Sequence, residues 1–189
     1  MQRINEDIKT GNFGQVYLLY GKEAYLRKQY KDKLSVALLG EGDAMNLHYY
    51  EGKDISMGEI IDLAETMPFL AERRTIIIEN SPFFKSEGEK IAEYLSAVPD
   101  TTYFVFVEES VDKRSKMYKA LAKNGCVVEA QGLSEDKLTT WVLQLLKRDN
   151  KKITQNTMNY LLDKIGTNME NIRQEVEKLV CYCYDKEVI

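Results

Sequence analysis

The first 132 residues alternate short apolar runs with longer segments of helical periodicity, and this rhythm constrains the fold more than any other feature. The short runs are rich in β-branched and aromatic residues, which favour strands; they are QVYLLY, MNLHYYEG, RTIIIE, TTYFVFVEE and CVVEA. The third run has no alternation of apolar and polar residues, which indicates a strand covered on both faces, as in a parallel sheet. The sequence therefore predicts an α/β domain over residues 1–132, with a parallel five-stranded sheet flanked by helices.

No strand pattern follows Gln131-Gly132. Residues 133–189 contain three segments of helical periodicity and predict a small helical domain. Ser134, Thr154 and Asn168 are candidate N-caps of these helices.

Two helix ends in the first domain carry local signals. Ser56 precedes Glu59 by three residues, which is the spacing of a capping box at a helix start. The inner face of that helix is predicted from its apolar spacing to contain Ile60, Leu63, Ala64 and Met67. Asn124-Gly125 predicts a left-handed stop at the end of a later helix.

Composition excludes several classes of protein. The 189 residues carry a net charge of −4, so the field of the whole molecule does not attract nucleic acid, and any DNA contact must be local. Three cysteines argue against a disulfide framework and for a reducing compartment. No apolar run approaches the roughly 18 residues of a membrane span, and the polar start is unlike a signal peptide. We therefore expect a cytoplasmic chain with no membrane partner.

A parallel sheet followed by helices would suit a nucleotide-binding ATPase, which needs a phosphate loop after its first strand. That loop reads Gly-x-x-x-x-Gly-Lys-Ser/Thr, so that backbone amides, the lysine and the hydroxyl converge on phosphate. Here Val16 stands at the first glycine position and Glu23 at the hydroxyl position. The sequence favours a tight turn at Gly21 and a place for Glu23 near a helix N-terminus, and it predicts no ATP site.

Few side chains could support other chemistry. Cys181 and Cys183 are two residues apart, so on a helix they point to different sides and cannot jointly hold zinc. Cys126 opens a strand and is expected in the core, and His48, the only histidine, is expected to be an ordinary strand residue. Residues 108–110, Glu-Glu-Ser, follow a strand but have no phosphate loop to assist. We predict no catalytic residue, no metal site and no cofactor.

The segment TMPFLAERRTIIIEN, from Thr66 to Asn80, contains an anomaly. Its second half reads as a strand, but Phe69 and Leu70 lie in the preceding connection, where backbone normally runs over the wet surface. From the residues alone, an apolar pair beside a strand is expected to be core. Pro68 is expected to break or redirect the preceding helix, since its ring removes a hydrogen bond and clashes with the turn before it.

Several segments together resemble the delta subunit of the bacterial DNA polymerase III clamp loader. They follow the family's order and spacing across essentially the whole chain: YGKEAYL, MPFLAERRTIIIE, TTYFVFVEESVDKRSKMYKAL and IGTNMENIRQEVEKL. The resemblance implies an AAA+-like domain with a decayed ATP site at residues 1–132 and a helical lid domain at 133–189. It also implies that the chain is truncated before a C-terminal collar domain.

The resemblance implies a mechanical activity. Delta subunits bind the ring-shaped sliding clamp, the beta subunit, and help to open it for loading onto primed DNA. The family's principal clamp contact is an apolar pair before the third strand, which falls on Phe69 and Leu70, flanked by Met67 and Pro68. The order Phe-Leu replaces the Leu-Phe that is frequent in relatives. Arg73 and Arg74 are expected to contribute either to the rim of that contact or to folding.

Further partners implied by the resemblance are the gamma or tau subunits, delta prime, and primer-template DNA within the assembled complex, with ATP acting in sister subunits. Two other classes stay open: a nucleotide-dependent AAA+ ATPase, and a generic protein- or DNA-interaction module. Titration with labelled ATP tests the first, and a clamp pull-down tests the second.

Overall fold

A computed structural model describes residues 1–40, 44–52 and 54–189 of the chain. The chain divides into two compact units, Met1–Ala130 and Gln131–Ile189. Within the described ranges, no helix combines the length and the apolar character that crossing a membrane requires.

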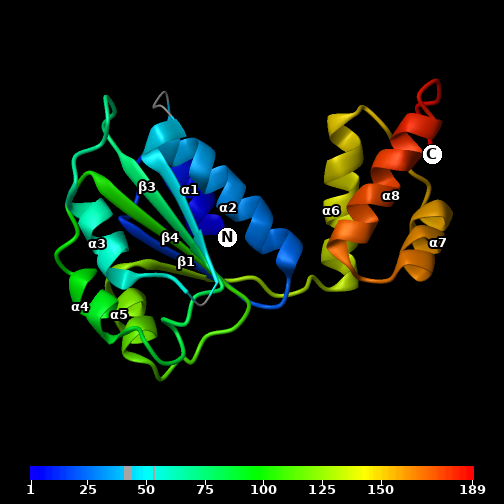
Figure 1. Cartoon of the computed structure of the whole chain (residues 1–189). Helices are drawn as coiled ribbons and strands as arrows, with labels where there is room; N and C mark the ends of the chain where they lie inside the picture. The colour runs from blue at the N-terminus through cyan, green and yellow to red at the C-terminus, as the bar shows by residue number, and fades with distance from the viewer. Residues whose placement is uncertain (41–43, 53) are drawn as a thin grey trace. The chain divides into compact units, whose positions relative to one another are not determined.

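The first unit contains a five-stranded parallel sheet, which confirms the predicted fold class (Figure 1). The strands are β1 (Val16–Tyr20), β2 (Leu47–Glu51), β3 (Arg74–Glu79), β4 (Thr102–Glu108) and β5 (Cys126–Glu129). Their order is β2-β3-β4-β1-β5, and every neighbouring pair is parallel. β3 is an inner strand whose Ile76, Ile77 and Ile78 are all fully buried, which explains why its sequence shows no alternation.

Helices cover both faces of the sheet (Figure 1). One face carries α1 (Gln2–Thr10) and α2 (Ala24–Leu39), and the other carries α3 (Met57–Glu65), α4 (Glu89–Tyr94) and α5 (Lys116–Asn124). Alternate side chains of a strand point to opposite faces, so Ile76 and Ile78 pack in one core cluster with Ile60 of α3 and Leu121 of α5. A short 3-10 helix, η1 (Ala44–Asn46), leads into β2, where the sequence predicted that the strand had already begun.

The predicted helix ends in this unit have different outcomes. Ser56 caps α3 as predicted, and its hydroxyl accepts a hydrogen bond from the Glu59 amide at 3.4 Å. The left-handed stop predicted at Gly125 is wrong, because its φ is −112°. Glycine is needed there for space instead: a Cβ atom would lie 2.9 Å from the carbonyl oxygen of Val16.

The second unit, all of whose residues are described, contains α6 (Glu135–Arg148), α7 (Gln155–Ile165) and α8 (Met169–Tyr182). Their apolar faces form its core, which includes Leu138, Val142, Leu146, Met158, Leu161, Met169, Ile172 and Val176. The side chains of Thr154 and Asn168 cap α7 and α8 as predicted. Ser134 occupies the N-cap of α6, but its hydroxyl makes no cap hydrogen bond. Two acidic residues in the first turn of α6 complement the helix dipole instead.

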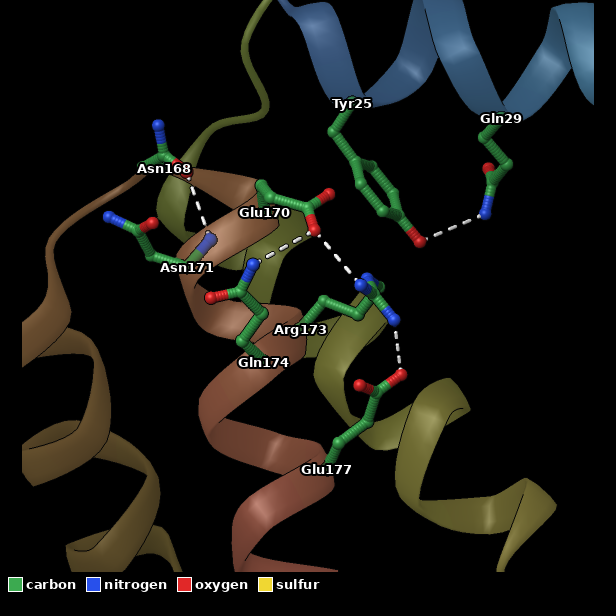
Figure 2. A network of polar contacts seen from close by, with 8 residues as sticks. All are labelled: Tyr25, Gln29, Asn168, Glu170, Asn171, Arg173, Gln174 and Glu177. Carbon is green, nitrogen blue, oxygen red and sulfur yellow. Dashed lines mark hydrogen bonds and ion pairs between the residues drawn. The ribbon is translucent and has the colours of Figure 1, made fainter.

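The pattern IGTNMENIRQEVEKL has a structural explanation in α8 (Figure 2). Arg173 pairs with Glu170 at 2.9 Å and also with Glu177, one turn away along the same face. Ile172 and Val176 are buried. Ion pairs three or four residues apart stabilise a helix by about 0.2–0.5 kcal/mol each. These contacts give the pattern a role in helix stability.

Candidate functional site

The anomalous apolar pair lies in the connection between α3 and β3, residues 66–73, at the amino end of β3 (Figure 1). Helix α3 ends at Glu65, and the Thr66 amide donates to the Leu63 carbonyl at 3.1 Å. Pro68 therefore lies beyond the helix, which corrects the expectation that it breaks or redirects it. Thr66, the C-cap, already has an extended backbone, and the ring of Pro68 restricts only Met67, a residue outside the helix, to extended conformations. The usual ligand site of open α/β sheets lies at the other end of the strands, outside their carboxyl ends.

Three large apolar side chains on the connection are exposed. Met67 is 78% exposed, Phe69 54% and Leu70 89%, and Pro68 is half-buried. The expectation that the pair is core, drawn from the residues alone, is wrong. Met67 also does not belong to the inner face of α3, because the helix has ended and the helical period no longer places its side chain. A soluble protein rarely exposes several neighbouring apolar side chains without a partner for them.

Asn46 anchors the centre of the connection. Its Nδ2 donates to the Phe69 carbonyl at 2.8 Å, and its Oδ1 accepts from the Phe69 amide at 2.7 Å. Asn46 is fully buried, at the end of η1, 23 residues earlier in the chain. Leu70, the residue that follows Phe69, has a φ of 48°, in the left-handed region that non-glycine residues rarely adopt.

Arg74 anchors the start of the connection. Its side chain is 6% exposed, so it belongs to the fold and not to the rim of a contact, the alternative that the sequence left open. Nη1 donates to the Leu63 carbonyl at 2.6 Å and to the carbonyl and hydroxyl of Thr66, and Nη2 donates to the Met67 carbonyl at 3.0 Å. A cation suits the Leu63 carbonyl in the last turn of α3, since it lies at the negative end of the helix dipole.

Arg73 lies over two aromatic rings. Its guanidinium is 5.1 Å from the ring centroid of Phe13 and 5.7 Å from that of Tyr103. It also borders a hollow of about 350 Å³ that Leu70 helps to line, beside the end of α2. Arg73 is therefore fixed next to the exposed side chains, in a position compatible with the predicted rim.

The turn after β1 is closed by backbone hydrogen bonds. The Gly21 amide donates to the Glu108 carbonyl at 3.2 Å, and the Glu23 amide donates to the Ala130 carbonyl at 3.1 Å. Glu23 is the N-cap of α2, and its carboxylate accepts from the Tyr25 amide, as the sequence predicts. Gly21 has a φ of 129°, which confirms the tight turn. The amides of Gly21 and Glu23, which a phosphate loop would direct at its ligand, are thus already bonded to backbone carbonyls.

A buried carboxyl group lies at the carboxyl ends of the strands, as the turn after β1 does. Glu108, 3% exposed, accepts hydrogen bonds at one oxygen from the Ser81 amide at 2.9 Å and the Ser81 hydroxyl at 2.6 Å. Burial raises the pKa of Glu108 to about 7, against the lowering effect of the Ser81 hydrogen bonds and of Lys85 and Arg27. The proton is therefore bound more tightly in the folded state than in the unfolded chain, whose glutamates titrate near 4.5.

We expect Glu108→Gln to stabilise the protein at pH 8. Because the folded state binds the extra proton, the free energy of unfolding falls as pH rises from about 4.5 to about 7, by on the order of 2–3 kcal/mol, and is then level. The glutamine side chain would keep the acceptor for Ser81 without the charge and remove this dependence. Urea unfolding at pH 5 and pH 8 measures it, with the exposed neighbour Glu109→Gln as the control. A variant that is no more stable than the parent at pH 8 would show that the carboxylate is not destabilised by burial.

The remaining candidates have structural surroundings. Cys126 is buried, as predicted, while Cys181 is exposed and Cys183 buried. His48 is a β2 residue, and burial together with the charge of Arg74 lowers its pKa. In the part of the chain that the structure describes, no three His, Cys, Asp or Glu side chains are grouped so as to hold a metal ion.

Sequence reasoning missed Asn46. The sequence pattern places it in a strand, and a lone asparagine 23 residues from the apolar pair carries no signal of contact with it.

The sheet order and the helices on both faces define an AAA+-like fold. One solved structure with this arrangement is that of a Thermotoga maritima DNA polymerase III gamma subunit-related protein. It superposes with a TM-score of 0.59 at 13% identity, covering 94% of this chain and 57% of the other, which is a likeness of fold alone. Residues 17–131 match the family described as DNA polymerase III, delta subunit. The chain belongs to that family.

Individual relatives agree with this assignment. The Bacillus subtilis DNA polymerase III subunit delta is 29% identical over 97% of this chain and 56% of its own length, and the probable delta subunit of Aquifex aeolicus is 27% identical over 93% and 52%. The solved B. subtilis DNA clamp loader delta protein superposes with a TM-score of 0.76 at 28% identity, covering 100% of this chain and 59% of that one. The chain thus spans about half the length of the curated relatives it matches.

Proposed function

We propose that this chain binds a sliding clamp through Phe69 and Leu70, flanked by Met67 and Pro68, and helps to open the clamp ring for loading onto primed DNA. The observation that carries the proposal is the group of exposed apolar side chains on an anchored connection, in a chain of the delta family. A pocket on the clamp would supply the other half of their apolar environment. Interface energy is typically concentrated in a few residues that fill well-packed pockets on the partner.

Opening needs no chemistry on this chain. A closed ring and an opened ring are two states, and a protein that binds the opened one more tightly shifts the population towards it. The shift equals the difference between the two binding free energies, so tight binding alone is not sufficient.

The proposal assigns no ATP hydrolysis to this chain. It is supported by the closed turn after β1, where the Gly21 and Glu23 amides are bonded to carbonyls, and by an acidic residue in place of the metal-binding hydroxyl. ATP would act in sister subunits, gamma or tau, which with delta prime and primer-template DNA are the other proposed partners.

The test combines binding with ring opening. Titration of fluorescent clamp with the purified chain is expected to give saturable one-to-one binding. Clamps preloaded on closed circular DNA are expected to leave faster when the chain is added without ATP, since they can leave only through an opened ring. Absence of binding at micromolar concentrations would overturn the proposal, and stoichiometric binding of magnesium-ATP would instead favour the ATPase alternative.

A further inference from the structure

We propose that Asn46 is a positioning residue for clamp binding: it fixes the backbone of Phe69 so that Phe69 and Leu70 are presented to the partner in one conformation. The inference rests on the proposed function and adds to it a fully buried residue whose side chain bonds only to the backbone of Phe69.

Two hydrogen bonds from the side chain of Asn46 hold the backbone of Phe69, and we call this pair of bonds the two-bond lock. The Asn46 side-chain amide satisfies both the N–H and the C=O of a single residue, at 2.7 and 2.8 Å, in the manner of a neighbouring β-strand. Because Asn46 is fully buried, no water competes for these bonds. A residue held by both of its backbone groups cannot rotate about its own φ and ψ without breaking one of them.

The lock has a consequence for Leu70. Its left-handed φ of 48° is unfavourable for a branched side chain by roughly 1–2 kcal/mol, and such conformations persist only where the surroundings determine them. The hydrogen bond to the Phe69 carbonyl fixes the peptide plane immediately before Leu70. Asn46 therefore maintains the direction of the most exposed apolar side chain in the connection.

A second anchor stands on the other side of Pro68. Arg74 binds the carbonyls of Thr66 and Met67, so the backbone is fixed at positions on both sides of the proline. A connection anchored in this way loses little conformational freedom when it binds, and less of the interaction energy is lost to ordering it. Anchored backbone with exposed apolar side chains is the arrangement expected of a preorganised binding element.

Asn46→Ala in the whole chain tests the proposal. We expect clamp affinity to fall about 10- to 100-fold, and the Phe69 amide to lose its protection from hydrogen exchange. In the background Phe69→Ala with Leu70→Ala, the same change is expected to have no further effect on the residual affinity, because nothing is left to position. A purely structural role would not produce this dependence on the background.

The controls separate positioning from stability. Leu121→Ala removes packing from the core under α5 and is expected to lower Tm with clamp affinity unchanged. Asn46→Ser, whose shorter hydroxyl cannot reach both backbone groups, serves if the alanine variant does not fold, and the same fall in affinity is expected. Binding by the Asn46 variants within twofold of the parent would overturn this inference alone. Unchanged binding by the Phe69 and Leu70 double variant would overturn the proposed function itself.

Discussion

Replacing both Phe69 and Leu70 with alanine is expected to weaken clamp binding by at least about 100-fold. Transfer of each side chain from water into an apolar pocket is worth roughly 1.5–3 kcal/mol, so the pair accounts for about 3–6 kcal/mol, and each 1.4 kcal/mol is a tenfold change. Titration of fluorescent clamp measures the loss. Single variants are expected to be intermediate, with the more exposed Leu70 free to bury more new surface than Phe69.

The same double variant is expected to keep its thermal stability. Both side chains are exposed, so their removal opens no cavity, and Tm should stay within about 2 °C of the parent. Tyr182→Ala with Tyr184→Ala removes two exposed aromatic rings from the second unit and is the matched control, with both affinity and Tm unchanged. A fall in Tm of many degrees for the Phe69 and Leu70 variant would mean that the pair is part of the core. A loss of binding would then reflect a disturbed fold and not a lost contact with the clamp.

The strands could be predicted from the sequence because the burial of a strand determines which types of residue follow one another within it. An inner strand of a parallel sheet has no polar face, so Ile76, Ile77 and Ile78 follow one another without interruption. The caps at Ser56, Thr154 and Asn168 are likewise local, since each side chain bonds an amide three residues ahead.

The candidate site could be predicted only in part, because its geometry depends on distant residues. The apolar pair was identified through a family resemblance, whereas its neighbours in sequence suggested core. The two-bond lock joins residues 23 positions apart, and the capping role of Arg74 requires the helix to end at Glu65. Gly125 shows the same limit, since the backbone of β1, not its own turn, requires a glycine there.

Gly21→Ala is expected to destabilise the first unit strongly. The turn has a φ of 129°, and a Cβ atom would lie 2.3 Å from the Ala130 carbonyl oxygen. That oxygen is backbone and accepts from the Glu23 amide, so it cannot move without breaking the closure of the turn. We expect a loss of about 3 kcal/mol or more of the free energy of unfolding, and a fall in Tm of roughly 6–12 °C.

Thermal unfolding followed by circular dichroism measures the effect, and Gly58→Ala is the matched control. Gly58 lies exposed in the first turn of α3, and an added Cβ atom would meet only the Ser56 hydroxyl oxygen, at 3.9 Å, so the methyl group should stabilise the helix by about 0.5–1 kcal/mol. The two glycine variants should therefore shift Tm in opposite directions. The comparison also tests why Gly21 precedes a lysine after the first strand. If the glycine served to let a phosphate approach, the fold without nucleotide would tolerate alanine there; a large loss of stability would assign Gly21 to the closure of its own turn.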